Sequence, residues 1–182
     1  TARSSSRSCA AAALPRPDRI DLRAEALDAF GQTFHDLRLS ASLAGPRWRA
    51  TLGSREASGE LQFDPSGRGA VRARLRHLAV ASTADGEARP DAAPDTRDSL
   101  ETLPALDVVA ERFSVGERQF GRLELQAVNE AANWRIETLS IGNADGRLDG
   151  KAVWRMRSPR RFELDFLLVA NDAGGLLERL GF

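Results

Sequence analysis

The 182-residue sequence contains little of several residue types on which common functions depend. Cysteine occurs once, at Cys9, which excludes an internal disulfide and a cysteine-based metal cluster. Histidine occurs twice and tyrosine not at all, and Lys151 is the single lysine among 26 basic residues. The sequence therefore offers few side chains for nucleophilic, proton-transfer or metal chemistry.

The chain also lacks an excess of charge of either sign. Its 26 acidic residues balance its 26 basic ones, whereas a nucleic-acid-binding domain generally carries a basic excess. No segment approaches the roughly 20 apolar residues of a membrane-spanning helix. The apolar patch from Ala10 to Leu14 is shorter than the core of a signal peptide, which needs about seven residues or more. A hydrophobic content of 42 % is too high for a wholly disordered chain.

What the sequence does contain, almost throughout, is alternation of apolar and polar residues. A period of two predicts β-strands with one apolar and one polar face, as in an antiparallel sheet that is wet on one side. We expect Arg on the polar face to lie opposite Asp or Glu of neighbouring strands. The clearest alternating segments are residues 20–26, 37–43, 48–52, 71–75 and 162–168.

The second half of the chain repeats the first. With a shift of 86 residues, segment 21–41 aligns with 107–127, and Trp48-Arg49 aligns with Trp134-Arg135. After a five-residue adjustment, a shift of 91 places Gly59 on Gly150, Phe63 on Trp154 and Val71 on Phe162. Strand repeats of this kind predict an array in which each unit extends the sheet of the unit before it.

We divide the chain into a disordered lead-in (1–18), a first β repeat (19–81), a linker or long loop (82–104) and a second β repeat (105–182). A short helix is expected at about residues 172–180, with Asp172 as its N-cap and Gly181 as its stop. The chain begins at Thr1 rather than Met, so we expect it to be a piece of a longer polypeptide.

The apolar face of such a sheet must be covered. One solution is a β-sandwich, in which a second sheet closes the core and the module serves for binding or as a scaffold. The other is a curved, gutter-like sheet whose apolar lining is filled by a ligand.

The candidates for chemistry are weak. His35 and His77 have no partner at metal-ligand spacing, and Asn143, Asp145 and Asp149 fit a hairpin turn better than a calcium loop. Nucleotide-binding and hydrolase motifs are absent, and the scattered carboxylates that a β-rich hydrolase would use form no cluster. The sequence therefore predicts no enzyme, no catalytic residue, no metal and no cofactor. The arginines at positions 68, 72, 74 and 76 indicate a solvated strand face, with contact to anionic lipid headgroups as the alternative.

Three segments resemble the C-terminal region of the AsmA-like proteins, specifically their YhdP branch. They are LPALDVVAERFSVGERQFGRLELQA (103–127), WRIETLSIGNADGRL (134–148) and DAGGLLERLGF (172–182). The resemblance covers roughly residues 20–182. It implies a mainly β fold, in which a curved antiparallel sheet of two repeated units forms a β-groove with a short C-terminal helix.

The same resemblance implies a function and a location. Proteins of this family are large bridge-like lipid transfer proteins with an inner-membrane anchor and a periplasmic body, and they have no catalytic residues to carry over. The chain is then a fragment that conducts phospholipids between the inner and outer membranes. Its implied partners are phospholipid acyl chains, the rest of the parent chain with its anchor, and other envelope proteins, but not nucleic acid.

A lipid conduit needs an apolar lining. Exposing an acyl chain to water costs roughly 0.8 kcal/mol per methylene, so about 30 methylenes cost on the order of 20 kcal/mol or more. Ordinary core packing is the alternative role for every apolar residue on such a face. The residues predicted to line the groove are Leu37, Leu39, Trp48, Leu123, Leu125, Trp134 and Ile136.

Overall fold

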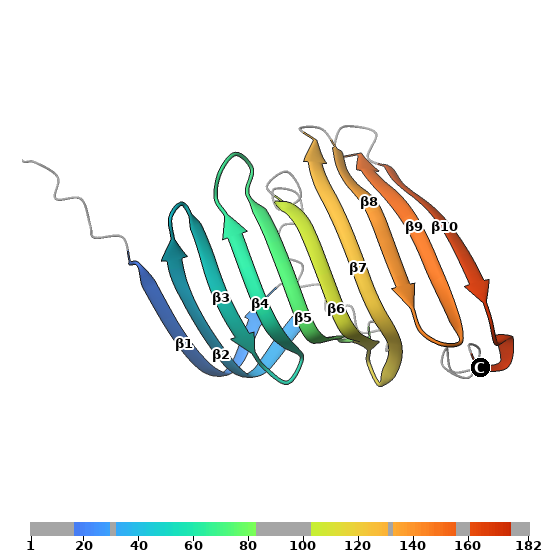
Figure 1. Ribbon diagram of the computed structural model, residues 1–182, viewed down its shortest axis with the longest axis horizontal. Coiled ribbons are helices and arrows are strands. Elements are labelled where there is room, and N and C mark those ends of the chain that lie inside the picture. Colours follow the sequence, from blue (N-terminus) through green and yellow to red (C-terminus); the bar gives the residue numbers. More distant parts are fainter. Residues whose placement is uncertain (1–16, 30–31, 83–102, 131–132, 156–160, 176–182) are drawn as a thin grey trace, which may run out of the picture.

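The computed structural model describes residues 17–29, 32–82, 103–130, 133–155 and 161–175. These residues form one ten-stranded sheet in which the order of the strands follows the order of the chain (Figure 1). The strands are β1 (Arg19–Ala29), β2 (Gln32–Ala44), β3 (Arg47–Gly53), β4 (Ala57–Asp64), β5 (Ala70–Val80), β6 (Ala105–Val115), β7 (Arg118–Glu130), β8 (Asn133–Gly142), β9 (Gly146–Arg155) and β10 (Arg161–Ala170).

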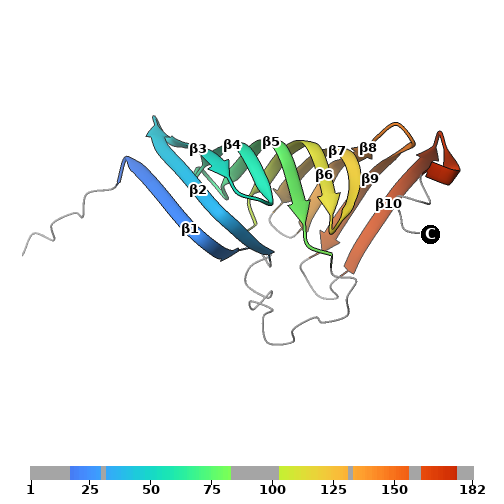
Figure 2. The same ribbon diagram turned by 90° about the horizontal axis from the view of Figure 1, so that it is seen from below.

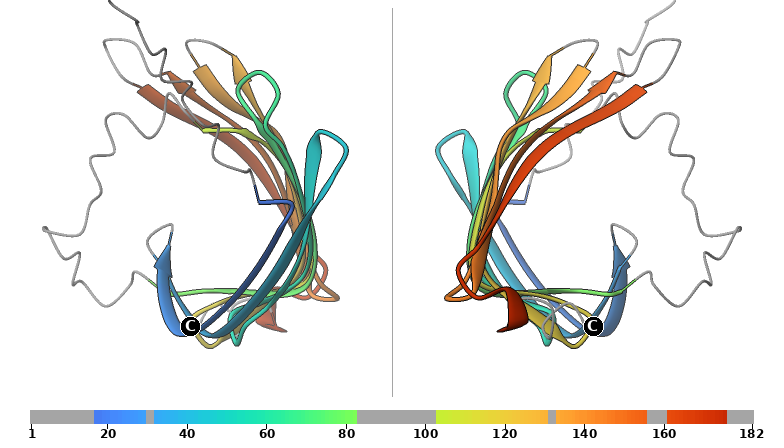
Figure 3. Two further views of the ribbon diagram at one scale, coloured as in Figure 1. Left: turned by 90° about the vertical axis from the view of Figure 1, so that its left-hand side faces the viewer. Right: turned by 90° about the vertical axis from the view of Figure 1, so that its right-hand side faces the viewer.

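The sheet is curved and lies in a single layer. Seen from below, its strands follow one another without a second sheet against either face (Figure 2). Seen along the strand order, it forms an arch that is open on one side (Figure 3). The predicted fold class, a mainly β, curved sheet, is confirmed. The self-closed β-sandwich is not what the described residues form.

The two halves of the sheet are copies at the level of strands. β1 and β6 are both 11 residues long, and β2 and β7 are both 13, with their first residues 86 positions apart. The pairing repeats as well: Phe63 lies opposite Val71 in the first unit, and Trp154 lies opposite Phe162 in the second. Each unit therefore contributes five strands with matching lateral contacts.

One strand pair corrects the expectation of an antiparallel sheet. β5 and β6 are parallel, whereas the other neighbouring strands are antiparallel. With five alternating strands in a unit, the fifth runs in the same direction as the first, and a second copy of the unit starts in that direction again. Parallel neighbours need a crossover of about a dozen residues or more, and residues 81–104 supply it.

Several predictions fall on residues outside the described part of the chain. These are most of the lead-in (1–16), most of the linker (83–102) and the helix beyond Gly175. The start of the helix is described at residues 173–175, where the Gly175 N–H donates to Asp172 Oδ1 at 3.1 Å. This bond gives Asp172 the contact expected of an N-cap.

The pairing register gathers the apolar side chains of all ten strands on one face. Residues that lie opposite each other across neighbouring strands point to the same side of a sheet, so most apolar residues share one face. A few apolar residues lie on the other face, such as Val109 opposite Glu124 and Leu167 opposite Asp149. The central apolar row is Leu22, Leu39, Leu52, Gly59, Leu75, Ala110, Leu123, Ile141, Leu148 and Leu168.

This apolar face is the concave one. Because the described residues form a single layer, side chains become buried mainly by crowding against others on the same face, and crowding is greatest on the inside of a curve. The centre of the crowded region is formed by Ala73, Leu75, Ala110 and Leu123. The buried apolar residues, all on this face, are Leu37, Ala41, Ala57, Ala73, Leu75, Ala110, Leu123, Ala127 and Ala152.

Two glycines allow strands to bend at register shifts. Gly59 has a φ of 151°, and a Cβ there would lie 2.2 Å from the Arg74 carbonyl oxygen. Gly121 has a φ of 96°, and its Cβ would lie 2.2 Å from the Gly142 carbonyl oxygen. The ladder shifts register beside both positions, as at β-bulges, which bend a strand and increase its twist.

We expect Gly59→Ala to destabilise the protein by about 2–3 kcal/mol, because the methyl group meets backbone atoms that cannot turn away. Denaturant unfolding measures this loss. Gly53→Ala is the matched control, since nothing lies within 4 Å of a Cβ at that position in β3. A loss at Gly59 no larger than that at Gly53 would contradict the account.

A charged clamp holds the parallel junction on the convex face. Arg74 bonds Asp107 through both terminal nitrogens, at 2.8 and 2.9 Å, and Arg72 Nε donates to the same carboxylate at 2.9 Å. The hydrogen bond from Arg74 is the largest cause that holds the pKa of Asp107 below its usual value. The clamp therefore joins the last strand of the first repeat to the first strand of the second.

We expect Asp107→Asn to cost about 1 kcal/mol of stability at neutral pH. A carboxyl group whose pKa is lowered by folding contributes above its unfolded pKa, near 3.9, and this contribution is lost as the pH falls through the folded pKa. The stability difference between wild type and variant should therefore shrink below about pH 4.

Asp21 is the control, because it occupies the matching position in β1 and its arginine partner, Arg19, lies on its own strand. Asp21→Asn should cost less than Asp107→Asn. An equal cost in urea titrations across this pH range would show that the clamp does not hold the junction.

Candidate functional site

The concave apolar face is continuous from β1 to β10 in the described residues. It crosses all ten strands, which at a spacing of about 4.8 Å gives a length of about 43 Å. Its middle rows are mostly aliphatic, and aromatic side chains lie toward both ends of the strands. Phe113 packs against Phe120 at one end, with 6.2 Å between ring centroids, and the tryptophans lie at the other end. There Trp154 packs edge-on against Phe162 at 5.7 Å between ring centroids, and Trp134 lies opposite Trp154.

All seven residues predicted to line a groove lie on this face. Leu37 and Leu123 are buried among their neighbours, with 4 % and 6 % of their surface exposed. Leu39, Trp48, Leu125, Trp134 and Ile136 are half-buried, so part of each remains open to a ligand. Contact with lipid stays a prediction for all seven.

The sequence-based selection omitted the most exposed part of the face. Phe162, Leu164, Phe166 and Leu168 of β10 are exposed, as are Ile20 and Leu22 of β1. Alternation in residues 162–168 marked them as one strand face. It could not show that β10 is the last strand among the described residues, where these side chains have a neighbouring strand on one side only.

The convex face is polar and laced with ion pairs. Besides the Asp107 clamp, Arg122 bonds Glu124 at 2.8 Å, Arg147 bonds Asp149 at 2.8 Å and Arg155 bonds Glu163 at 3.2 Å. Arg72 and Arg74, which the sequence offered as a headgroup contact, are engaged with Asp107, so the solvated strand face describes them better. This face therefore presents charged side chains to water, while the other face is apolar.

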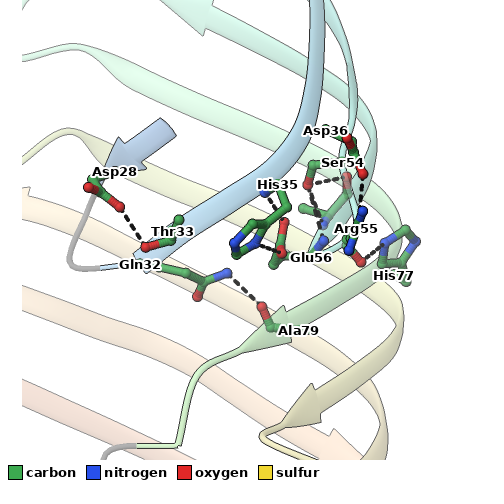
Figure 4. Close-up of polar contacts among 11 residues, drawn as sticks. Asp28, Gln32, Thr33, His35, Asp36, Ser54, Arg55, Glu56, His77 and Ala79 are labelled. Atoms are coloured by element: carbon green, nitrogen blue, oxygen red, sulfur yellow. Dashed lines mark hydrogen bonds and ion pairs between the residues drawn. The ribbon is translucent and has the colours of Figure 1, made fainter. Parts of the chain in front are cut away.

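The two histidines brace the turn between β3 and β4 (Figure 4). Glu56 accepts hydrogen bonds from the backbone N–H of His35 and from its Nδ1, both at 2.7 Å. His77 bonds Ser58 at 2.8 Å and the Arg55 carbonyl oxygen at 3.0 Å. These contacts connect β2 and β5 to the turn between β3 and β4, so both histidines have a structural role.

The candidate calcium loop is a hairpin turn. The side-chain oxygen of Asn143 accepts hydrogen bonds from the N–H groups of Asp145 and Gly146, at 2.9 and 3.1 Å, and so serves the turn between β8 and β9. In the described ranges no three His, Cys, Asp or Glu side chains are grouped so as to hold a metal ion. Among these same residues, no helix has the length and apolar character to cross a membrane.

A family model described as YhdP protein matches residues 2–182, which is nearly the whole chain. The chain therefore belongs to the YhdP family, as the three resembling segments predicted. The name of this family indicates no enzymatic activity. No curated protein and no solved structure matches the chain.

We expect the concave face to divide into a packed centre and an open lining. Leu123→Ala should cost about 3 kcal/mol, as for a buried leucine, and Leu125→Ala about half as much, because its side chain is only partly buried. Chemical denaturation of both variants measures the difference. Equal losses of unfolding free energy would mean that Leu123 and Leu125 are equally well packed, and would contradict the division into a packed centre and an open lining.

Proposed function

We propose that this chain is a section of a conduit along which phospholipids move with their acyl chains on the concave face. The observation that carries the proposal is an apolar concave face that continues across both repeats and has no second layer over it in the described residues. Membership of the YhdP family supports a role related to lipid transport.

The dimensions of the face suit this cargo. The hydrocarbon core of a bilayer is about 30 Å thick, so an acyl chain reaches about 15 Å, against about 43 Å for the face. A lipid bound anywhere along the face therefore leaves free apolar surface ahead of it and behind it. Because each row repeats at every strand, a shift by one strand spacing returns the acyl chain to a similar environment.

The convex face supports the same function by its solubility. Several of its arginines are paired with carboxylates on the same or the next strand, and the formal charges of the whole chain sum to zero. Headgroups would remain in water at the open side of the arch while the acyl chains lie against the lining. This division needs no energy-coupled chemistry within the chain.

We further propose that this section works in the periplasm, as part of a protein tethered to the inner membrane through segments beyond these 182 residues. The other partners in this proposal are the rest of the parent chain and envelope proteins at the two membranes. A section exposed on one face to water and on the other to acyl chains fits the space between two membranes.

Site-specific photo-crosslinking tests the conduit. A benzophenone amino acid placed at Leu39 or Leu125 should form adducts with phospholipid when the purified protein is mixed with phosphatidylethanolamine–phosphatidylglycerol vesicles, as read by mass spectrometry. Ser40 and Gln126 are matched controls, since each is the next residue along the same strand and faces the convex side. Equal labelling at both faces, or no adduct at either, would refute the proposal.

A charge on the lining gives a second test. Leu125→Asp should lower lipid adducts at position 39 several-fold, because an ionised carboxylate in the path raises the cost of placing an acyl chain beside it. Circular dichroism and the unfolding midpoint establish that the variant is folded. A folded variant with unchanged adducts would show that Leu125 does not line the path.

A further inference from the structure

All three tryptophans of the sequence lie on the concave face, one residue inside the same margin of the sheet. Trp48 and Trp134 are the second residues of β3 and β8, and Trp154 is the last but one of β9. Phe63 lies opposite Trp48, and Phe162 lies opposite Trp154. We call these five side chains the tryptophan margin; β4 and β9 end at it, at the top of Figure 1.

Both repeats contribute to this margin. A shift of 86 residues places Trp48 on Trp134, and a shift of 91 places Phe63 on Trp154, so each unit supplies one cross-strand aromatic pair. In membrane proteins, tryptophans at one depth mark the level at which acyl chains give way to polar headgroups, because the ring is apolar and its N–H is polar. The tryptophan margin has the composition of such a level.

The opposite margin of the same face has a different chemistry. Phe113 of β6 and Phe120 of β7 pack against each other there, and neither ring carries a hydrogen-bond donor. The face therefore has aromatic residues with a polar group at one margin and wholly apolar aromatic residues at the other. A bound molecule with one polar end is not held equally well in the two directions.

Two of the three indole N–H groups are unused. Trp134 Nε1 donates to the Pro104 carbonyl oxygen at 3.3 Å. Trp48 and Trp154 are half-buried, and among the described residues no acceptor bonds the N–H of either. An N–H group that leaves water without gaining an acceptor costs free energy. An ester or phosphate oxygen of a lipid would supply that acceptor, whereas an acyl chain would not.

A cationic side chain lies at the same margin. Arg68, in the turn between β4 and β5, donates to Asn129 Oδ1 at 2.7 Å, and Asn129 lies opposite Trp134. The next residue, Gly69, lies against Phe63, whose ring would be 3.2 Å from a Cβ at that position. Arg68 is exposed, and no carboxylate in the described part of the chain pairs with it. Its charge is therefore available to an anion at the tryptophan margin.

Two carboxylates of this margin have cationic partners of their own. Asp64, at the end of β4, bonds Arg47 Nε at 2.8 Å, and Glu130, at the end of β7, bonds Arg135. These pairs leave Arg68 as a cation without a neutralising partner among the described residues. A phosphate group suits this place, because arginine binds phosphate oxygens through charged hydrogen bonds.

An acyl chain anchored at this margin ends near the centre of the face. Its length of about 15 Å corresponds to about five residues of a strand at about 3.3 Å each. That distance leads from Trp134 along β8 to Leu139, which lies opposite Leu125. The methyl end then lies among half-buried leucines, and Phe113 of the opposite margin lies beyond it.

We propose that the tryptophan margin holds the headgroup end of a bound glycerophospholipid, so that the lipids on the concave face share one orientation. The indole N–H groups of Trp48 and Trp154 donate to ester or phosphate oxygens, and Arg68 pairs with the phosphate of a lipid near the junction of the two repeats. The acyl chains run from this margin toward the centre of the face. This inference rests on the proposed conduit and adds the direction in which its cargo lies.

Fluorescence quenching by brominated lipids tests the orientation. The 182-residue chain is incubated with phosphatidylethanolamine–phosphatidylglycerol vesicles that contain phosphatidylcholine brominated either near the glycerol or near the methyl end, and the vesicles are then removed by centrifugation. Bromine quenches tryptophan only at short range. The native tryptophans should therefore be quenched several-fold more by the bromine near the glycerol.

A chain with its tryptophan at the other margin is the control. Phe113→Trp, combined with W48F, W134F and W154F, should be quenched weakly, and more by the bromine near the methyl end. Circular dichroism checks that this variant is folded. If it is not, the native chain still decides the question, because all of its tryptophans lie at one margin.

Removing the cation tests the headgroup contact separately. Arg68→Gln should lower the binding of phosphatidylglycerol about fivefold, and it should leave the binding of diacylglycerol, which has acyl chains but no phosphate, unchanged. Mass spectrometry of the lipid that remains bound measures both. Arg118→Gln is the matched control, because it removes an exposed arginine at the start of β7, beside Phe120, and should change neither.

The failure of this orientation and the failure of the conduit give different results. Equal quenching by the two lipids, or stronger quenching by the bromine near the methyl end, would overturn the orientation and leave the conduit in place. An equal loss of both lipids in Arg68→Gln, or no loss of either, would overturn the contact between Arg68 and the phosphate. A native chain that retains no lipid would overturn the conduit and this inference together.

Discussion

Lateral register is the constraint on which this molecule depends. A strand has a side-chain period of two, so a slip of one residue in any pair would turn every later apolar row to the wrong face. The central row nevertheless stays apolar from Leu22 of β1 to Leu168 of β10. Where the ladder does shift, as between Ser58 and Gly59, an unpaired residue is absorbed in a bulge and the apolar side resumes beyond it. The shifts therefore bend the sheet without breaking the face.

Much of this arrangement was predictable from the sequence, because it depends on local period. Alternation around Leu39 and Leu125 set the faces, and the shift of 86 residues set the equivalence of the two units. The parallel junction was not predictable in this way, since it depends on whether the number of strands in a unit is odd, and a single misplaced turn changes that parity. The exposure of Phe166 could not be predicted either, because it depends on which strands lie beside β10 and not on the alternation within the strand.

The pairing of charges on the convex face explains why the net charge of the chain is zero. Many arginines of the convex face lie beside a carboxylate, and the contact between Arg74 and Asp107, which uses both terminal nitrogens of the arginine, lies where the two repeats meet. Because charges of both signs lie on the convex face, neighbouring strands do not repel each other there, and the sheet can curve without an electrostatic cost.

The fold leaves its apolar face without a second layer, and this open face is the basis of the proposed function. A closed core would bury the apolar rows completely and leave no surface for a cargo, whereas an open arch leaves rows such as Leu39 and Leu125 half-covered. The cost of that exposure is offset in part by the crowding of Leu75, Ala110 and Leu123 at the centre. The same repetition that holds the sheet together makes successive positions along the groove alike. A cargo that binds by apolar contact alone then meets no deep well in which to stop, so a surface of this kind suits passage better than storage.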